Sequence, residues 1–300
     1  MMEFVNTQLP MYRKERIRLR ELSEISNEFY AFICGSDQVW STRLQNDHCD
    51  KGMFLRFVPE GVKKIGYAPS MGATISVSEE TATEICESLS DFDAVSVREK
   101  TGQNLLQEIL GRKVPLVLDP TLLLDRKEWE NIAEVPRGLP ERYLVVYRFG
   151  SMAYTIETIN EIVEKTGFPV IELPSSRIAM EDGFPKRFDI DPGAFIGLIR
   201  NATLVLTDSF HATVFSILNA TPFISFYRQD PSLPFNMNSR LDDLLSMTGL
   251  NERLCPIGEK VNYDNLFDVD FTDAHKAIDE RRDSSLSYLS AALNGDGIHV

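Results

Sequence analysis

The chain has 300 residues, and its 31 basic and 45 acidic side chains give a formal net charge of −14. This acidic balance argues against a nucleic-acid-binding protein, which needs a basic face, and it requires any site for an anionic ligand to concentrate positive charge locally. The hydrophobic fraction of 43% is that of a globular protein, and a chain of this length predicts two domains.

The hydrophobicity of the chain and the spacing of its cysteines argue against a membrane-spanning, secreted or zinc-binding protein. No stretch approaches the roughly 18 consecutive apolar residues of a transmembrane helix, and the N-terminal segment is polar and basic, unlike a secretory signal. The four cysteines are widely spaced and include no CxxC pair. We therefore expect reduced thiols in a cytoplasmic protein, without a zinc site or a disulfide framework.

Secondary-structure patterns in the first half of the chain alternate between two periods. A charged segment at residues 11–29 predicts a helix. Short apolar runs that end in Gly, Ser, Asp or Pro then predict strands, and the segments between them have the period of amphipathic helices. The predicted strands are 29–35, 62–70, 92–99 and 114–124, and the predicted helices are 78–90 and 99–111.

The second half of the chain continues the same alternation and then changes character. Its predicted strands are 142–150, 169–174, 202–209 and 221–227, and its predicted helices are 154–167, 192–202, 211–220 and 239–249. After about residue 255 the strand pattern stops, and a long amphipathic segment at 273–293 predicts a closing helix.

The alternation predicts the fold class and the domain boundaries. Continuous Val, Ile and Leu runs between helices are typical of parallel strands covered on both faces, so we predict an α/β protein of two doubly wound, Rossmann-like lobes. The N-terminal lobe is expected to lack its opening βα unit, because no strand precedes residue 29. The predicted parts are an N-terminal lobe at 1–124, a linker at 125–141, a C-terminal lobe at 142–255 and a helical tail at 256–300.

The most informative junction follows the predicted strand at 202–209. In an open parallel sheet, ligands bind beyond the carboxyl ends of the strands, at the mouth of the cleft between two lobes. Asp208 and Ser209 are good helix N-cap residues, and His211 then falls in the first helical turn. A histidine there can exchange protons near neutral pH beside main-chain N–H groups that favour an anion. A capped helix with a partly exposed histidine is the alternative.

A second junction is GSDQVW at residues 35–40. Gly35 permits close backbone approach, and Ser36 or Asp37 can cap the next segment. Polar recognition of a sugar by Gln38 and stacking of the sugar on Trp40 are possible, and a capped turn is the alternative. Neither GxGxxG nor GxxxxGK[ST] occurs, so a dinucleotide or P-loop site is not indicated.

Other strand ends offer further polar side chains. Tyr67 and Ser70 lie in the small-residue junction YAPSMG. Arg98 lies at the end of the predicted strand at 92–99 and can present a fork to a carboxylate or phosphate, or else form an ordinary ion pair. Arg148 ends the first strand of the second lobe, and Arg240 opens the helix at 239–249.

Six sequence motifs, in their order along the chain, resemble the polysaccharide pyruvyl transferase family over roughly residues 30–255. The motifs are GSDQVW (35–40), YAPSMG (67–72), SVREKTG (96–102), VLDPTLLL (117–124), DSFHATVFSILNATPFI (208–224) and SRLDDLLSMTGL (239–250). The resemblance implies a two-lobed fold similar to GT-B glycosyltransferases. It also implies transfer of the enolpyruvyl group of phosphoenolpyruvate to two hydroxyls of a sugar, in a polysaccharide or a lipid-linked precursor, without a tightly bound organic cofactor.

The resemblance also implies roles for individual residues. His211 matches the family's acid–base histidine, and Arg98 matches a strand-end arginine that binds the donor. Members of the family carry a basic residue two positions before the histidine, where this chain has Ser209. Donor binding would therefore fall to Ser209 with the helix N-terminus, or to Arg98, Arg148 or Arg240. Relatives also open with a strand and a glycine-containing loop that have no counterpart before residue 30.

The predicted catalytic residue is thus His211, and no metal site is predicted. Should a divalent metal hold the donor phosphate, Asp37, Asp119 and Asp208 are the candidate ligands. Two other functions compete with pyruvyl transfer: a nucleotide-sugar glycosyltransferase or epimerase, and a carbohydrate-binding relative without catalysis. The residues predicted to bind substrate are Gly35, Ser36, Asp37, Gln38, Tyr67, Ser70, Arg98, Arg148, Asp208, Ser209 and Arg240.

Overall fold

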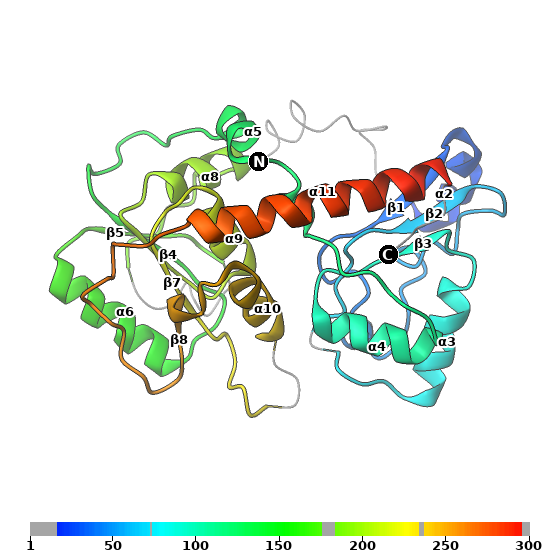
Figure 1. The fold of residues 1–300 in the computed structure, drawn as a ribbon, viewed down its shortest axis with the longest axis horizontal. Helices are drawn as coiled ribbons and strands as arrows, with labels where there is room; N and C mark the ends of the chain where they lie inside the picture. The colour runs from blue at the N-terminus through cyan, green and yellow to red at the C-terminus, as the bar shows by residue number, and fades with distance from the viewer. Residues whose placement is uncertain (1–16, 73, 176–183, 234–236, 296–300) are drawn as a thin grey trace. The chain divides into compact units, whose positions relative to one another are not determined.

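The computed structural model describes residues 17–72, 74–175, 184–233 and 237–295, which form two compact units (Figure 1). The N-terminal lobe contains the described chain up to Leu123 together with the segment from Asp279 onward. The C-terminal lobe is Leu124–Ile278. Each lobe has its own parallel sheet.

The described part of the N-terminal lobe contains a three-stranded parallel sheet in the order β1-β2-β3. Cys34 pairs with Gly66, and Gly66 with Val95, so the three strands end at one edge. The strands are β1 (Ala31–Cys34), β2 (Lys63–Gly66) and β3 (Ala94–Val95), and the helices are α2 (Leu19–Ile25), α3 (Glu79–Leu89) and α4 (Lys100–Leu110).

Both faces of this sheet are covered, as its apolar strands require. One face packs on the main core of the lobe, which includes Trp40, Ile85 and Leu106. The other face is covered by the second part of α11 (Thr272–Asn294), whose Tyr288 packs with Ile65 of β2 in a separate cluster. The predicted closing helix is therefore confirmed, and its continuation beyond Asp279 belongs to the core of this lobe.

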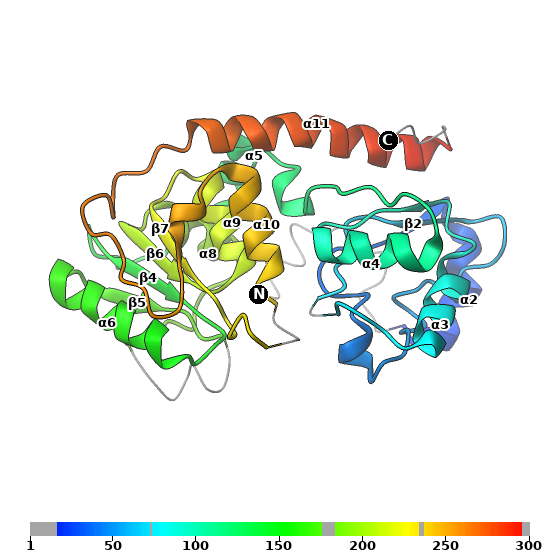
Figure 2. The same cartoon turned by 60° about the horizontal axis from the view of Figure 1, so that its bottom comes forward.

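The C-terminal lobe contains a five-stranded parallel sheet in the order β5-β4-β6-β7-β8. The chain goes from β4 outward to β5 and then returns to the other side of β4, so the direction of winding reverses between β4 and β6. Helix α6 packs on one face, and α8 and α9 lie on the other (Figure 2). The strands are β4 (Leu144–Tyr147), β5 (Val170–Glu172), β6 (Leu204–Thr207), β7 (Phe223–Phe226) and β8 (Leu254–Cys255), and the helices are α5 (Arg126–Ile132), α6 (Ala153–Thr166), α8 (Pro192–Arg200), α9 (Phe210–Leu218) and α10 (Ser239–Thr248).

The predicted α/β class is confirmed, with three local differences. The segment 114–124 forms only a bridge between Leu116 and Val97 and a short 3-10 turn, because its prolines cannot donate to a ladder. The stretch 125–141, predicted as a linker, contains α5, which begins at a capping box formed by Asp125 and Glu128. Of the predicted helix at 11–29, α2 covers the middle, and residues 1–16 lie outside the described residues.

The possible sugar-stacking role of Trp40 is wrong. Its side chain is fully buried, and it stacks on Phe54 with ring centroids 5.4 Å apart. The indole N–H donates to the carbonyl oxygen of Met53 at 3.1 Å. A Cβ at Gly66 of β2 would come within 2.4 Å of the indole ring, so the glycine leaves room for this residue in the core.

Replacement of Trp40 by alanine is expected to destabilise the protein by about 3–5 kcal/mol, because a fully buried indole leaves a cavity. Trp40→Phe should cost less, since the stacking on Phe54 is retained. Urea unfolding followed by circular dichroism measures both changes. Phe188→Ala is the matched control, because this aromatic side chain is 70% exposed and should change the unfolding midpoint little. A Trp40→Ala protein as stable as the control would contradict the core assignment.

Candidate functional site at the carboxyl ends of the strands

The predicted site residues fall into two sets, one in each lobe. The set in the C-terminal lobe gathers at the carboxyl ends of β4 and β6, where Tyr147 pairs with Thr207. These are the two strands between which the winding reverses, and open α/β sheets bind ligands at such a switch point. The predicted junction after β6 therefore lies at the switch point of this sheet.

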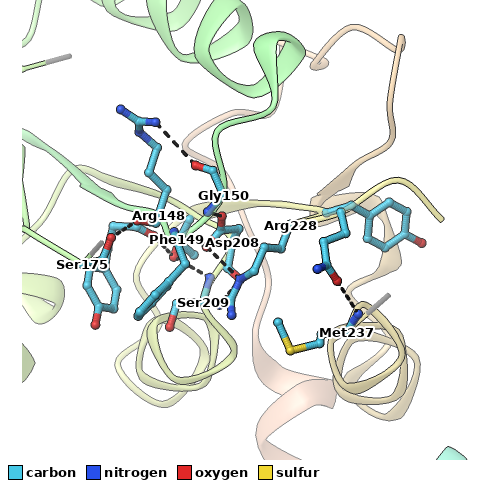
Figure 3. A network of polar contacts seen from close by, with 12 residues as sticks. Arg148, Phe149, Gly150, Ser175, Asp208, Ser209, Arg228 and Met237 are labelled. Carbon is cyan, nitrogen blue, oxygen red and sulfur yellow. Dashed lines mark hydrogen bonds and ion pairs between the residues drawn. The ribbon is translucent and has the colours of Figure 1, made fainter. Parts of the chain in front are cut away.

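Asp208 joins the two strand ends. Its carboxylate is buried and accepts two main-chain hydrogen bonds, from the N–H of Phe149 at 2.8 Å and from that of Gly150 at 2.7 Å (Figure 3). A Cβ at Gly150 would lie 3.0 Å from the carboxylate and 2.8 Å from the carbonyl oxygen of Arg228, so this close approach requires glycine. Asp208 therefore fixes the loop after β4 to the start of α9.

The helix that carries His211 begins as the sequence predicts. Ser209 is the N-cap of α9, and its hydroxyl accepts from the N–H of Ala212 at 3.4 Å. The hydroxyl of Thr207 accepts from the N–H of Ser209 and donates to the carbonyl oxygen of Tyr147, which holds the turn against β4. His211 is the second residue of the helix and is partly exposed, with its ring edge-on to Phe210.

Arg228, which the sequence analysis did not select, lies beside Asp208 at the start of α9. One Nη donates to the carbonyl oxygen of Asp208 at 3.2 Å, and Nε lies 3.6 Å from the Asp208 carboxylate (Figure 3). The guanidinium also lies over the ring of Phe149, 4.5 Å from its centroid. The predicted strand at 221–227 ends one residue before Arg228, so the strand-end rule applied to this strand would have found it.

A small recess adjoins this cluster. Its volume of about 10 Å³ is close to that of one ordered water, and its walls include Arg228, Arg240 and Asn238. The Asn238 side chain donates to the carbonyl oxygen of Gln229 at 2.7 Å and so ties the start of α10 to the segment after β7. Arg240, a predicted site residue, is therefore brought beside Asp208 and Arg228.

Arg148 belongs to a buried ion-pair cluster on the other side of β4. Its Nε lies 3.1 Å from Glu172, whose second carboxylate oxygen lies 3.0 Å from Nζ of Lys186. The carbonyl oxygen of Arg148 accepts a hydrogen bond from the hydroxyl of Ser175. Glu172 is fully buried, so these cations are needed to satisfy its charge.

In the N-terminal lobe, Arg98 is buried among three carboxylates. It donates to Asp119 at 2.5 Å and to Asp37 at 3.0 Å, and its Nε lies 3.7 Å from Glu99. Burial opposes the charge, but Asp119, Glu99 and Asp37 outweigh it and hold the pKa of Arg98 above its ordinary value. The hydroxyl of Ser36 donates to the same Asp119 oxygen at 3.1 Å, so the arginine orders the turn after β1.

The remaining residues of this set surround that turn. Gly35 has φ +131°, and a Cβ there would lie 1.9 Å from the carbonyl oxygen of Tyr67, which restricts the position to glycine. The Tyr67 hydroxyl points into the lobe and donates to the carbonyl oxygen of Leu118 at 3.0 Å, and burial raises its pKa. Ser70 is buried, and its N–H donates to the carbonyl oxygen of Asp37, whereas the Gln38 side chain is partly exposed.

Within the described ranges, no group of three or more His, Cys, Asp or Glu side chains is placed to hold a metal ion. Of the three candidate metal ligands, Asp37 and Asp119 pair with Arg98, and Asp208 accepts from the main chain. No described helix has the length and apolar character needed to cross a bilayer.

Comparisons with known proteins agree with this architecture. The family model described as "Polysaccharide pyruvyl transferase" matches residues 5–230, whereas no curated protein sequence matches the chain. A Listeria monocytogenes protein assigned as UDP-N-acetylglucosamine 2-epimerase is 12% identical, with a TM-score of 0.50 over 91% of this chain and 77% of that one. UDP-GlcNAc 2-epimerase from Neisseria meningitidis, bound to UDP-GlcNAc, is 10% identical with a TM-score of 0.47 (94% and 75% covered). The likeness to the Listeria protein shows the fold alone, and the predicted GT-B-like class is confirmed.

Removal of the Arg98 guanidinium is expected to destabilise the protein strongly. Arg98→Met leaves Asp119 and Glu99 buried without their cation, which typically costs about 3–5 kcal/mol. Asp119→Asn added to Arg98→Met should restore part of this loss, because the uncompensated charge is removed. The free energy of unfolding in urea measures both. Arg126→Met is the control, because it breaks an exposed ion pair with Glu130 and should cost at most about 1 kcal/mol. If Arg98→Met costs no more than this control, the assignment of Arg98 to a buried ion-pair cluster is wrong.

A second prediction concerns the carboxylate of Asp208. Asp208→Asn retains only one accepting oxygen for the two N–H groups of Phe149 and Gly150, so we expect a loss of about 1–3 kcal/mol in unfolding free energy. Asp230→Asn is the matched control, because exposed Asp230 accepts from Ser232 through one oxygen that the amide keeps. Hydrogen exchange should also show a faster Gly150 amide in Asp208→Asn only. Unchanged exchange at Gly150 would rule out the tether.

Proposed function

Because the chain belongs to the polysaccharide pyruvyl transferase family, we propose that it transfers the enolpyruvyl group of phosphoenolpyruvate to two hydroxyls of a sugar. The product is a pyruvate ketal, and phosphate is released. The acceptor is a sugar of a polysaccharide or of a lipid-linked precursor, and the reaction takes place in the cytoplasm. No organic cofactor is required, since the donor itself supplies the transferred carbons.

The reaction defines what the site must do. Two C–O bonds form between the sugar oxygens and the second carbon of the donor, and the bond from that carbon to the phosphate oxygen breaks. One hydroxyl proton ends on the methylene carbon, which becomes a methyl group, and the other ends on the departing phosphate. A group that accepts and returns protons near neutral pH is therefore needed, and histidine is the side chain best suited to this.

The observation that carries the proposal is the position of His211. It lies in the first turn of α9, at the carboxyl end of β6, next to the strand pair where the winding reverses. Ser209 and Thr207 hold that turn, and Asp208 fixes it to the loop after β4. A partly exposed imidazole on a rigid turn can meet a donor and exchange protons with it.

The N-terminal lobe, taken by itself, carries a second set of candidate substrate-binding groups. The side chain of Asp37 is 66% exposed although one oxygen pairs with Arg98, and Gln38 follows it on the same turn. These two side chains suit the hydroxyls of a sugar, as carboxylates and amides accept or donate hydrogen bonds. Because Arg98 is buried among carboxylates, its part in this proposal is to order Ser36 and Asp37.

Phosphate release tests the proposal directly. With phosphoenolpyruvate and a panel of acceptor sugars, the wild-type protein should release phosphate only when a suitable acceptor is present. His211→Ala should lower this rate by about 10²–10⁴-fold, the usual contribution of a general acid–base. His48→Ala is the matched control, because His48 is a surface residue of the N-terminal lobe with a 71% exposed side chain, and it should retain full activity.

Thermal-shift measurements separate the competing functions. Stabilisation by phosphoenolpyruvate, with none by UDP-GlcNAc, is the expected result. The opposite pattern would indicate a nucleotide-sugar enzyme and would refute pyruvyl transfer. If only sugars stabilise the protein and the wild type releases no phosphate, there is no activity for His211→Ala to reduce. That result would indicate a carbohydrate-binding protein without catalysis.

A further inference from the structure

The junction that carries His211 supplies no cation of its own. Residues 207–212 read Thr-Asp-Ser-Phe-His-Ala, and the chain as a whole carries a net charge of −14. The proposed donor brings a carboxylate and a phosphate into this acidic surrounding. A positive group must therefore reach the start of α9 from another part of the lobe.

Arg228 provides that group from the neighbouring strand. β7 pairs with β6, with Thr207 opposite Ser225, so the residue two positions beyond Phe226 lies at the same edge of the sheet as Ser209. The hydrogen bond from Arg228 to the carbonyl oxygen of Asp208 places the guanidinium beside the N-cap of α9 (Figure 3).

The guanidinium is held firmly but retains hydrogen-bonding capacity. One Nη donates to the main-chain carbonyl oxygen of Asp208, and Nε lies 3.6 Å from the Asp208 carboxylate. The guanidinium group lies over the ring of Phe149. Within the described residues, the other Nη of Arg228 has no acceptor, and 19% of the side chain is exposed. An arginine fixed in this way has lost its side-chain entropy before a ligand arrives, so an anion can be bound at lower cost.

The charge of Asp208 does not cancel that of Arg228 completely. Both carboxylate oxygens already accept main-chain N–H groups, from Phe149 and Gly150, which draw part of the negative charge away from the arginine. Arg240, on the wall of the adjoining recess, adds a second positive charge. Two arginine side chains therefore lie at this edge of the sheet in a protein that is acidic overall.

We propose that Arg228 binds an anionic group of the donor, its carboxylate or its phosphate, beside the N-cap of α9, and that Asp208 is the positioning residue that orients it. This inference rests on the proposed function. The positively charged group that binds the donor is then the guanidinium of Arg228 at the end of β7, outside the junction that carries His211.

Calorimetric titration with phosphoenolpyruvate tests this assignment without knowledge of the acceptor. Arg228→Met should weaken the Kd by about 10- to 100-fold, the range of a hydrogen bond to a charged group. Arg228→Lys should recover only part of the affinity, because it keeps the charge and loses the planar fork. Arg200→Met, which removes a half-buried arginine that pairs with Glu130 in the same lobe, is the matched control and should bind like the wild type.

Two further readouts distinguish donor contact from a structural role. Because Arg228 carries the charge, the dependence of the Kd on salt should be weaker in Arg228→Met than in wild type, whereas a structural loss leaves that dependence unchanged. Titration with inorganic phosphate and with pyruvate identifies the anion, since only the group that contacts Arg228 should lose affinity in the variant.

The outcomes separate the two proposals. Wild-type protein that does not bind phosphoenolpyruvate would refute the proposed function. Wild-type binding that Arg228→Met changes by less than twofold would refute this inference alone. Equal losses in Arg228→Met and Arg228→Lys, with unchanged salt dependence and a matching drop in unfolding midpoint, would assign Arg228 to folding and also overturn it.

Discussion

The buried carboxylate of Asp208 is the constraint on which the C-terminal site depends. A carboxylate removed from water must be compensated: two main-chain N–H groups of the loop after β4 donate to Asp208, and the guanidinium of Arg228 forms an ion pair with it. Because these partners follow β4 and β7 while Asp208 follows β6, three strand ends are fixed relative to one another. The turn that carries His211 takes its position from this arrangement.

In the N-terminal lobe the buried charge that must be compensated is positive. Arg98 is buried, and Asp37, Glu99 and Asp119 surround it at the ends of β1 and β3 and before the 3-10 turn. Its charge is thereby compensated within the lobe, and its main effect is to order the turn that presents Asp37. In an acidic chain, the cations that remain effective toward a ligand are those with a hydrogen-bonding edge directed away from carboxylates.

The fold leaves the chemistry open. A similar architecture occurs in the Listeria protein assigned as a UDP-N-acetylglucosamine 2-epimerase, and at 12% identity this likeness concerns the backbone alone. What separates one enzyme of such a fold from another is the set of side chains at the strand ends. In this chain, Arg228 and Arg240 line one recess with Asp208 and Phe210 at the start of α9, within a lobe matched largely by the pyruvyl transferase family model.

The sequence by itself determined the α/β class, nearly all the strands and helices, and the junction of His211, because these depend on periodicity and on capping residues that are neighbours in the chain. It missed α5 and β8, and the tertiary structure alone decided the partners of the site residues. Trp40 lies in the core because Gly66 of β2 makes room for it. Arg98 meets Asp37 across 61 residues and Asp208 meets Phe149 across 59, and no local pattern encodes such contacts. Arg228 acquires its place only when β7 pairs with β6, since strand order is set by long-range packing.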